Sequence, residues 1–255
     1  MTAISILTHS VRMLLNNLPA AFRVSIVLYL GIIVINYINQ VRLIQLVEQS
    51  GGTIRMSDLQ TPSFMLPTFA LIFVSLLLGF WISIAWHRYI LLQDLPDGII
   101  PPVSGGAILA YLWLCLQIAV AIILVIVGAL FAIGFILAIA GITISATFVS
   151  FVTTIIGLIF FYRLCPVLPA AAIGKKLTLS KAWSATRGQT GTIVTLALIG
   201  GFVVLVIKLP SMFGGDPLSI INLTYAAVTG WFTMLIGVSV MTTFYGHFVE
   251  GRKIV

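Results

Sequence analysis

Six apolar runs, separated by short polar connectors, dominate the hydropathy pattern of this chain. They cover residues 20–40, 65–86, 107–131, 144–162, 192–209 and 218–245. A helix needs about 20 apolar residues to cross the hydrocarbon core of a bilayer, and each run is close to that length. The strands of a membrane β-barrel would instead alternate polar and apolar residues, and these runs do not. The pattern predicts an all-α polytopic membrane protein with six transmembrane helices.

Composition leads to the same class of protein. Of the 255 residues, 60% are hydrophobic and 7% are charged, against about 25% charged in an average soluble domain. The two cysteines, Cys115 and Cys165, show neither a disulfide framework nor the spacing of metal ligands. Residues 1–255 are therefore predicted to form a single integral membrane domain.

The basic residues indicate how this domain is oriented. If the N-terminus lies inside, ten bases fall on the cytoplasmic side, namely Arg12, Arg23, Arg88, Arg163, Lys175, Lys176, Lys181, Arg187, Arg252 and Lys253. Three fall outside, namely Arg42, Arg55 and Lys208. The positive-inside rule favours this arrangement, with both termini in the cytoplasm. A third span between Ala107 and Tyr162 would lose the bias.

Aromatic residues end each of the three inward-going spans. Trp86, Tyr162 and Tyr245 lie where ring side chains favour the headgroup level of a membrane. A base follows each of them and could reach anionic headgroups. These rings are predicted to be interfacial anchors, and the chain is predicted to form three helical hairpins in series with cytoplasmic interfacial helices.

The clearest interfacial helix is predicted at residues 4–18. Its apolar residues recur at helical spacing on one face, namely Ile4, Leu7, Val11, Leu14 and Leu18. Such a helix can lie in the membrane plane before the chain turns inward. The alternative is an N-terminal extension that packs against the bundle.

The connector after the fourth span carries the densest basic charge. A short helix is predicted there, capped at its start by Thr178 or Ser180 and ended near Gly188. We expect lipid or partner contacts from this connector and from two bases at the preceding span ends, namely Arg88, Arg163, Lys175, Lys176, Lys181, Trp183 and Arg187. The alternative is that these bases only determine topology.

The segment from Leu168 to Gly188, "LPAAAIGKK" followed by "LSKAWSATRG", resembles a stretch of bacterial polytopic inner-membrane proteins of unassigned activity. Some of those proteins are grouped with the membrane domain of glycerophosphodiester phosphodiesterases. The resemblance implies a location in the bacterial inner membrane and the same architecture. It implies no catalytic activity, because this chain leaves no segment for the catalytic barrel of those enzymes.

Candidate chemistry is sparse. No catalytic, cofactor-binding or metal-ligating residues are predicted, because paired carboxylates, phosphate loops and nucleophile motifs are missing from the sequence. His9, His87 and His247 map to the cytoplasmic face, where hydrogen-bonding or solvated roles are favoured over an axial-ligand role for His87. Gln117 is expected to bond between helices or to line a small cavity.

Taken together, the sequence favours a non-enzymatic accessory, assembly or scaffold subunit of a membrane complex, or a lipid-interacting protein. Its expected partners are membrane lipids, including anionic ones, and other membrane protein subunits, but not nucleic acid. The alternative is a small permease for an apolar or lipid-like solute, since such a solute needs no charged residue at the midplane.

The predicted topology can be tested with reporter fusions. A reporter after Val255 and a reporter within Gly51 to Thr61 should report opposite compartments, because five predicted spans separate the first loop from the C-terminus. The same compartment at both sites would contradict six spans with cytoplasmic termini.

Overall fold

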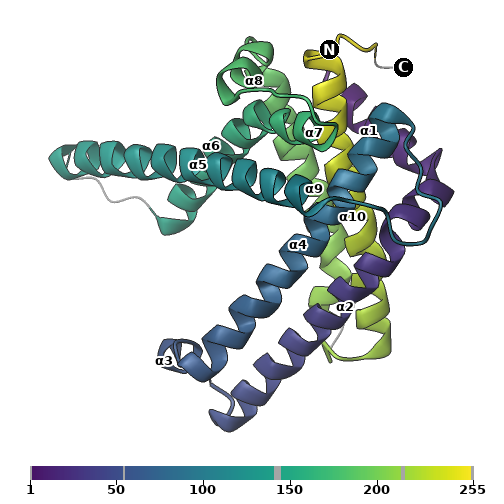
Figure 1. Cartoon of the computed structure of the whole chain (residues 1–255). Helices are drawn as coiled ribbons and strands as arrows, with labels where there is room; N and C mark the ends of the chain where they lie inside the picture. The colour runs from purple at the N-terminus through teal and green to yellow at the C-terminus, as the bar shows by residue number, and fades with distance from the viewer. Residues whose placement is uncertain (1, 54, 141–144, 214–215, 254–255) are drawn as a thin grey trace.

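The computed structural model describes residues 2–53, 55–140, 145–213 and 216–253 (Figure 1). These residues form ten α-helices and, within the described ranges, no β-strand. In chain order the helices are α1 (Ala3–Leu15), α2 (Leu18–Gln49), α3 (Met56–Leu59), α4 (Pro62–Leu92), α5 (Gly105–Ala140), α6 (Ala146–Leu164), α7 (Val167–Ala172), α8 (Leu179–Ala185), α9 (Thr190–Phe213) and α10 (Ile220–Phe248).

Six of these elements are long and apolar enough to cross a membrane, which confirms the predicted fold class. They are α2, α4, α5, α6 with α7, α9 and α10. Each overlaps one predicted span and most extend beyond it, although α10 begins at Ile220 and not at Leu218; the predicted start of the fourth span at Ile144 lies outside the described residues. Helix α5 continues past the predicted end of the third span at Phe131 to Ala140.

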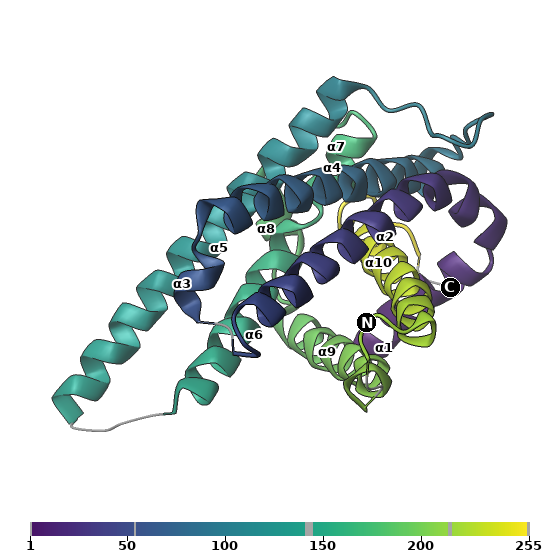
Figure 2. The same ribbon diagram turned by 90° about the horizontal axis from the view of Figure 1, so that it is seen from below.

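The three hairpins share one packed end and diverge from it (Figures 1 and 2). The buried residues of every spanning helix gather at the end where α1, α7 and α8 also lie, which we call the core end. Towards the opposite, far end the helices expose large apolar side chains. Helix α5, with 36 residues, is roughly 54 Å long at 1.5 Å per residue, so it must tilt strongly to fit a hydrocarbon layer of about 30 Å.

Helix α1 packs against α9 and α10 along one flank of its apolar face. Ile6, Ser10 and Leu14 are buried there, and the Ser10 hydroxyl lies 3.0 Å from the hydroxyl of Thr243. The other flank stays open, with Ile4 64% exposed. The helix therefore adopts the bundle-packed alternative along one flank, and Leu14, which we expected to face lipid, lies in the core.

Prolines near the far end leave backbone carbonyls in α4 and α9 without their usual helical donors. Pro67 has no N–H for the carbonyl of Ser63, and the Arg42 guanidinium of α2 donates to the carbonyls of Ser63 and Phe64, at 3.0 Å to the latter. In the last hairpin Pro210 lies inside α9 and has no N–H for the carbonyl of Val206, and the Tyr225 hydroxyl donates to the neighbouring carbonyl of Ile207 at 2.7 Å. Inside a bilayer such bonds help to satisfy the carbonyls around each proline, and they tie the first and the last hairpin across their two helices.

Helices α2 and α10 approach each other at Gly230. The Tyr29 hydroxyl donates to the carbonyl of Ala227 at 2.8 Å, and a Cβ at Gly230 would lie 2.7 Å from that hydroxyl. The small-residue spacing of Ala226 and Gly230 therefore serves a contact within the chain.

Replacing Gly230 with alanine should displace Tyr29 and break its hydrogen bond, at a cost of about 1–3 kcal/mol in unfolding free energy. The control is Gly237→Ala in the same helix, where no heavy atom lies within 4 Å of the added Cβ. That variant should be neutral or more stable by up to about 1 kcal/mol, from helix propensity. Denaturation in mixed micelles, followed by circular dichroism, compares the two, and equal effects would contradict the close approach.

Candidate functional site: the core end

Five side chains form a hydrogen-bonded cluster inside the core end, which we call the polar knot: Trp86, His87, Tyr111, Ser239 and Thr242. The Trp86 indole N–H donates to the Ser239 hydroxyl at 2.9 Å. The Nδ1 atom of His87 lies 2.8 Å from the Thr242 hydroxyl, and its Nε2 atom lies 3.3 Å from the Tyr111 hydroxyl. The knot joins α4, α5 and α10.

This environment differs from the solvated position considered for His87. The side chain is fully buried, and both of its ring nitrogens face a hydroxyl. A metal or pigment could bind either nitrogen only by breaking one of these hydrogen bonds. His87 therefore holds helices together, which is the hydrogen-bonding role that the sequence favoured.

The three predicted anchors lie deeper than we expected. Trp86 and Tyr245 are buried within the protein, with exposed fractions of 0% and 2%. Tyr162 is half-buried, and its ring stacks on Phe244 at a centroid distance of 5.5 Å. These rings thus contribute to helix packing at the core end, and their expected headgroup contact stays a prediction for Tyr162 alone.

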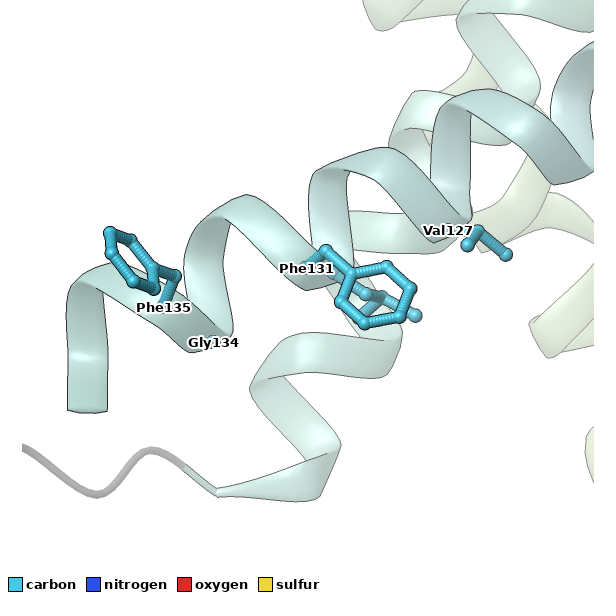
Figure 3. A pocket seen from close by; sticks show the side chains of 5 residues that line it. Val127, Phe131, Gly134 and Phe135 are labelled. Carbon is cyan, nitrogen blue, oxygen red and sulfur yellow. The ribbon is translucent and has the colours of Figure 1, made fainter.

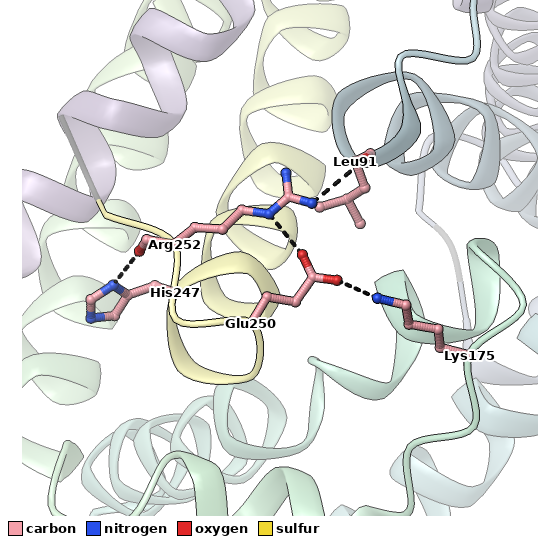
Figure 4. A network of polar contacts seen from close by, with 5 residues as sticks. All are labelled: Leu91, Lys175, His247, Glu250 and Arg252. Atoms are coloured by element: carbon pink, nitrogen blue, oxygen red, sulfur yellow. Dashed lines mark hydrogen bonds and ion pairs between the residues drawn. The ribbon is translucent and has the colours of Figure 1, made fainter.

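A carboxylate clamp ties the chain after α10 to two other hairpins (Figure 4). Glu250 accepts hydrogen bonds from Lys175 and from Arg252, each at 2.7 Å. Arg252 also donates to the Leu91 carbonyl at the end of α4, and the Nδ1 atom of His247 lies 2.9 Å from the Arg252 carbonyl. Glu250 therefore links the ends of all three hairpins.

Electrostatics keep this clamp charged near neutral pH. Burial raises the pKa of Glu250, but hydrogen bonds from Lys175 and Tyr245 and the charge of Arg252 outweigh it, so the pKa lies below its ordinary value. The hydrogen bond to Glu250 is the main cause that raises the pKa of Lys175. Lys175, expected to contact lipid or a partner, is thus engaged within the chain.

The connector between α7 and α9 carries the remaining basic charge. Helix α8 begins after Thr178, whose hydroxyl accepts a hydrogen bond from the Lys181 N–H at 3.3 Å, which confirms the predicted cap. Trp183 packs on Phe160, and the Arg163 guanidinium lies 4.4 Å from its ring centroid. This cation–π contact holds α8 against the end of α6.

Three of the six bases that were predicted to contact lipid or a partner form neither an ion pair nor a side-chain hydrogen bond in the described part of the chain. Lys176, Lys181 and Arg187, which we call the basic connector, are exposed and form no ion pair among the described residues. Arg88, by contrast, pairs with Asp94, at 2.9 Å from its Nε atom. Among the described residues, five bases of the core end have neither an ion pair nor a side-chain hydrogen bond; these three lie around α8, and the other two are Arg12 and Lys253.

The rest of the described structure offers fewer polar or ionisable groups that could form a functional site. A hollow of about 540 Å³ beside the far half of α5 is lined by Val127, Leu130, Phe131, Gly134 and Phe135 (Figure 3). All of these come from one helix and none is polar, so the hollow offers only contact with acyl chains. Within the described part of the chain, no group of three or more His, Cys, Asp or Glu side chains could hold a metal ion.

Comparison with protein-family models, with curated proteins and with solved structures gives no match. The resemblance to the membrane domain of glycerophosphodiester phosphodiesterases therefore stays a prediction. What the fold defines is a multi-pass, all-α membrane protein with six apolar helices.

The sequence missed the polar knot, although one signal for it was present. Ser239, Thr242 and Thr243 recur at positions i, i+3 and i+4 and so share a face of α10. Hydroxyls on one face of a spanning helix commonly bond to neighbouring helices. This row of hydroxyls predicts polar partners on neighbouring helices. In the structure, ring nitrogens of Trp86 and His87 bond to the hydroxyls of Ser239 and Thr242.

Replacing Glu250 with glutamine should release the chain after α10. The ionised Glu250 carboxylate stabilises the fold fully at any pH above the pKa that it has in the unfolded chain. This stabilisation is lost as the pH falls through its lower pKa in the folded protein. The stabilisation by Lys175, whose pKa is raised on folding, is lost only at alkaline pH. Hydrogen exchange of residues 249–253 should therefore be faster in Glu250→Gln than in the wild type at pH 7. The two should converge in acid, whereas exposed Glu48→Gln should match the wild type throughout. A difference between Glu250→Gln and wild type that persists unchanged in acid would contradict the clamp.

Proposed function

We propose that this protein is a non-enzymatic, lipid-contacting subunit of the bacterial inner membrane, with both termini in the cytoplasm. Its working surface is the basic connector, which holds the anionic inner leaflet and so fixes the position of the bundle for an accessory or scaffold role. The proposal rests on the difference between the bases that form ion pairs within the chain and those that do not. Lys176, Lys181 and Arg187 are exposed and unpaired among the described residues, whereas Arg88, Lys175 and Arg252 are engaged within the chain.

The geometry around α8 supports contact with headgroups. The Trp183 ring is half-buried between Phe160 and the Arg163 guanidinium, so α8 is held firmly while its bases point outward. Each base near an anionic leaflet contributes about 1 kcal/mol. The interior offers little for catalysis, since the polar knot uses its groups to bond to one another.

A permease for an apolar or lipid-like solute is the second candidate. A cavity of about 490 Å³ between α9 and α10 is lined by Lys208, Tyr225, Thr229 and Thr233 together with apolar residues. The permease is favoured by this lining of both polar and apolar side chains between the two helices of one hairpin. Gln117, by comparison, is half-buried on α5 and has no hydrogen-bond partner among the described residues.

The variant Lys176→Gln/Lys181→Gln/Arg187→Gln tests the first candidate. At low salt it should weaken selection of anionic over zwitterionic lipid by on the order of a hundredfold at most, from three contributions of about 1 kcal/mol. Spin resonance of labelled lipids measures the selection, and added salt should reduce it in the wild type. Arg55→Gln/Lys208→Gln at the far end is the charge control.

Unchanged lipid selection in the triple variant would contradict this working surface. Loss of a transport activity in Lys208→Gln or Gln117→Leu, with the triple variant like the wild type, would favour the permease instead. Identification of what co-migrates in mild detergent separates a lipid-only role from a stoichiometric protein partner.

A further inference from the structure

A polar cavity opens at the core end where α1 meets the start of α2 and the end of α4. Its volume is about 420 Å³, and five polar side chains from these elements line it, namely His9, Arg12, Asn16, Asn17 and Gln93. Met13 and Ile90 supply the apolar part of the lining. The cavity lies away from the basic connector and shares no residue with it.

The charge of this cavity is positive, and no acidic side chain among the described residues pairs with it. Arg12 is exposed and has neither an ion pair nor a hydrogen-bond partner among the described residues. None of the lining residues is acidic. The nearest carboxylate in sequence to the lining, Asp94, is already paired with Arg88. An anion would thus meet a guanidinium and neutral side-chain amides, with no acidic residue in the described lining to compete.

The lining is also held in place. The Asn17 amide donates to the Met13 carbonyl at 2.8 Å, and its oxygen accepts from the Tyr89 hydroxyl at 2.7 Å. The turn between α1 and α2 is thereby fixed to α4. Arg12 and Asn16, which flank this turn, therefore keep their position relative to Gln93.

Gln93 adopts a backbone conformation that glycine would adopt without strain. Its φ is +57°, and it is the one non-glycine residue with positive φ in the described part of the chain. Glycine is the usual residue at this position after a helix, because a Cβ is disfavoured there. A side chain is nevertheless present, and it lines the cavity; strain of this kind often marks a functional position.

We propose that this cavity binds the phosphate group of an anionic phospholipid. A guanidinium and side-chain amides are suitable donors for phosphate oxygens. The ligand is a lipid because the cavity has an apolar part and lies beside the start of α2, one of the helices long and apolar enough to cross a membrane. Exposed Leu15 and Leu92, each 49% exposed, border the same elements and offer contact for an acyl chain.

This inference deepens the proposed lipid-contacting role by giving it a shaped site. It uses other residues than the basic connector, so either can fail without the other. The test therefore uses variants of the cavity and a charge control at the far end, made in the full chain, and the basic connector keeps its separate lipid-selection assay.

The experiment is a titration of the detergent-solubilised protein with dioctanoyl phosphatidylglycerol, read by native mass spectrometry as bound lipid per chain. Arg12→Gln should bind about tenfold more weakly, which corresponds to the loss of one charged contact. Gln93→Gly should also bind more weakly, yet melt at no lower temperature than the wild type, because it relieves the backbone. Arg55→Gln, which removes an exposed base at the far end, should bind this lipid as the wild type does.

Each opposite outcome overturns the proposal. Wild-type affinity in both Arg12→Gln and Gln93→Gly would show that the cavity does not hold the lipid. An equal loss in Arg55→Gln would show that binding is diffuse attraction to positive charge. Displacement of the lipid by inorganic phosphate at a similar concentration would show that the ligand is a free anion and not a lipid.

Discussion

Hydrogen bonds that water cannot replace hold this bundle together. In an apolar environment a polar group without a partner is costly, so each buried donor has to find an acceptor within the protein. Trp86 and His87 find theirs on α10 and α5, and the carbonyls near Pro67 and Pro210 find donors on the neighbouring helix of the same hairpin. The first group sets the core end, and the second ties together the two helices of the first and of the last hairpin.

This distribution explains the shape of the molecule. Apolar side chains gain little from leaving lipid for protein, so apolar packing alone does not draw spanning helices together. The helices converge where hydroxyls, ring nitrogens and the Glu250 clamp lie, and they diverge where large apolar side chains are exposed. Charge follows the same logic, since bases such as Arg88, Lys175 and Arg252 bond within the chain, whereas those around α8 are left exposed.

Local properties of the sequence were sufficient to predict the fold class. Hydropathy is local, so the six apolar helices and the Thr178 cap could be found from neighbouring residues. Contacts between residues far apart in the sequence could not be found in this way. Trp86 was predicted at headgroup level because aromatic rings commonly lie there, but Ser239 lies 153 residues further on and draws it inside. Lys175 looked free because its ion-pair partner, Glu250, lies 75 residues away in the sequence. The face of α1 that is buried is determined by its contact with α10, and the spacing of apolar residues within α1 does not reveal it.

The pairing of α1 with α10 also constrains how the molecule is made. Ser10 and Thr243 are 233 residues apart, and the hydroxyl partner of His87 on α10 follows it by 155 residues. Helices enter the membrane in the order of their synthesis, so α1 and α4 wait for their acceptors until the last hairpin arrives. During that interval Trp86 and His87 depend on water, lipid headgroups or the insertion machinery for hydrogen bonds. Biogenesis therefore ends with a closing step rather than with stepwise assembly, and a chain cut before α10 would retain most of its spans but could not complete its core.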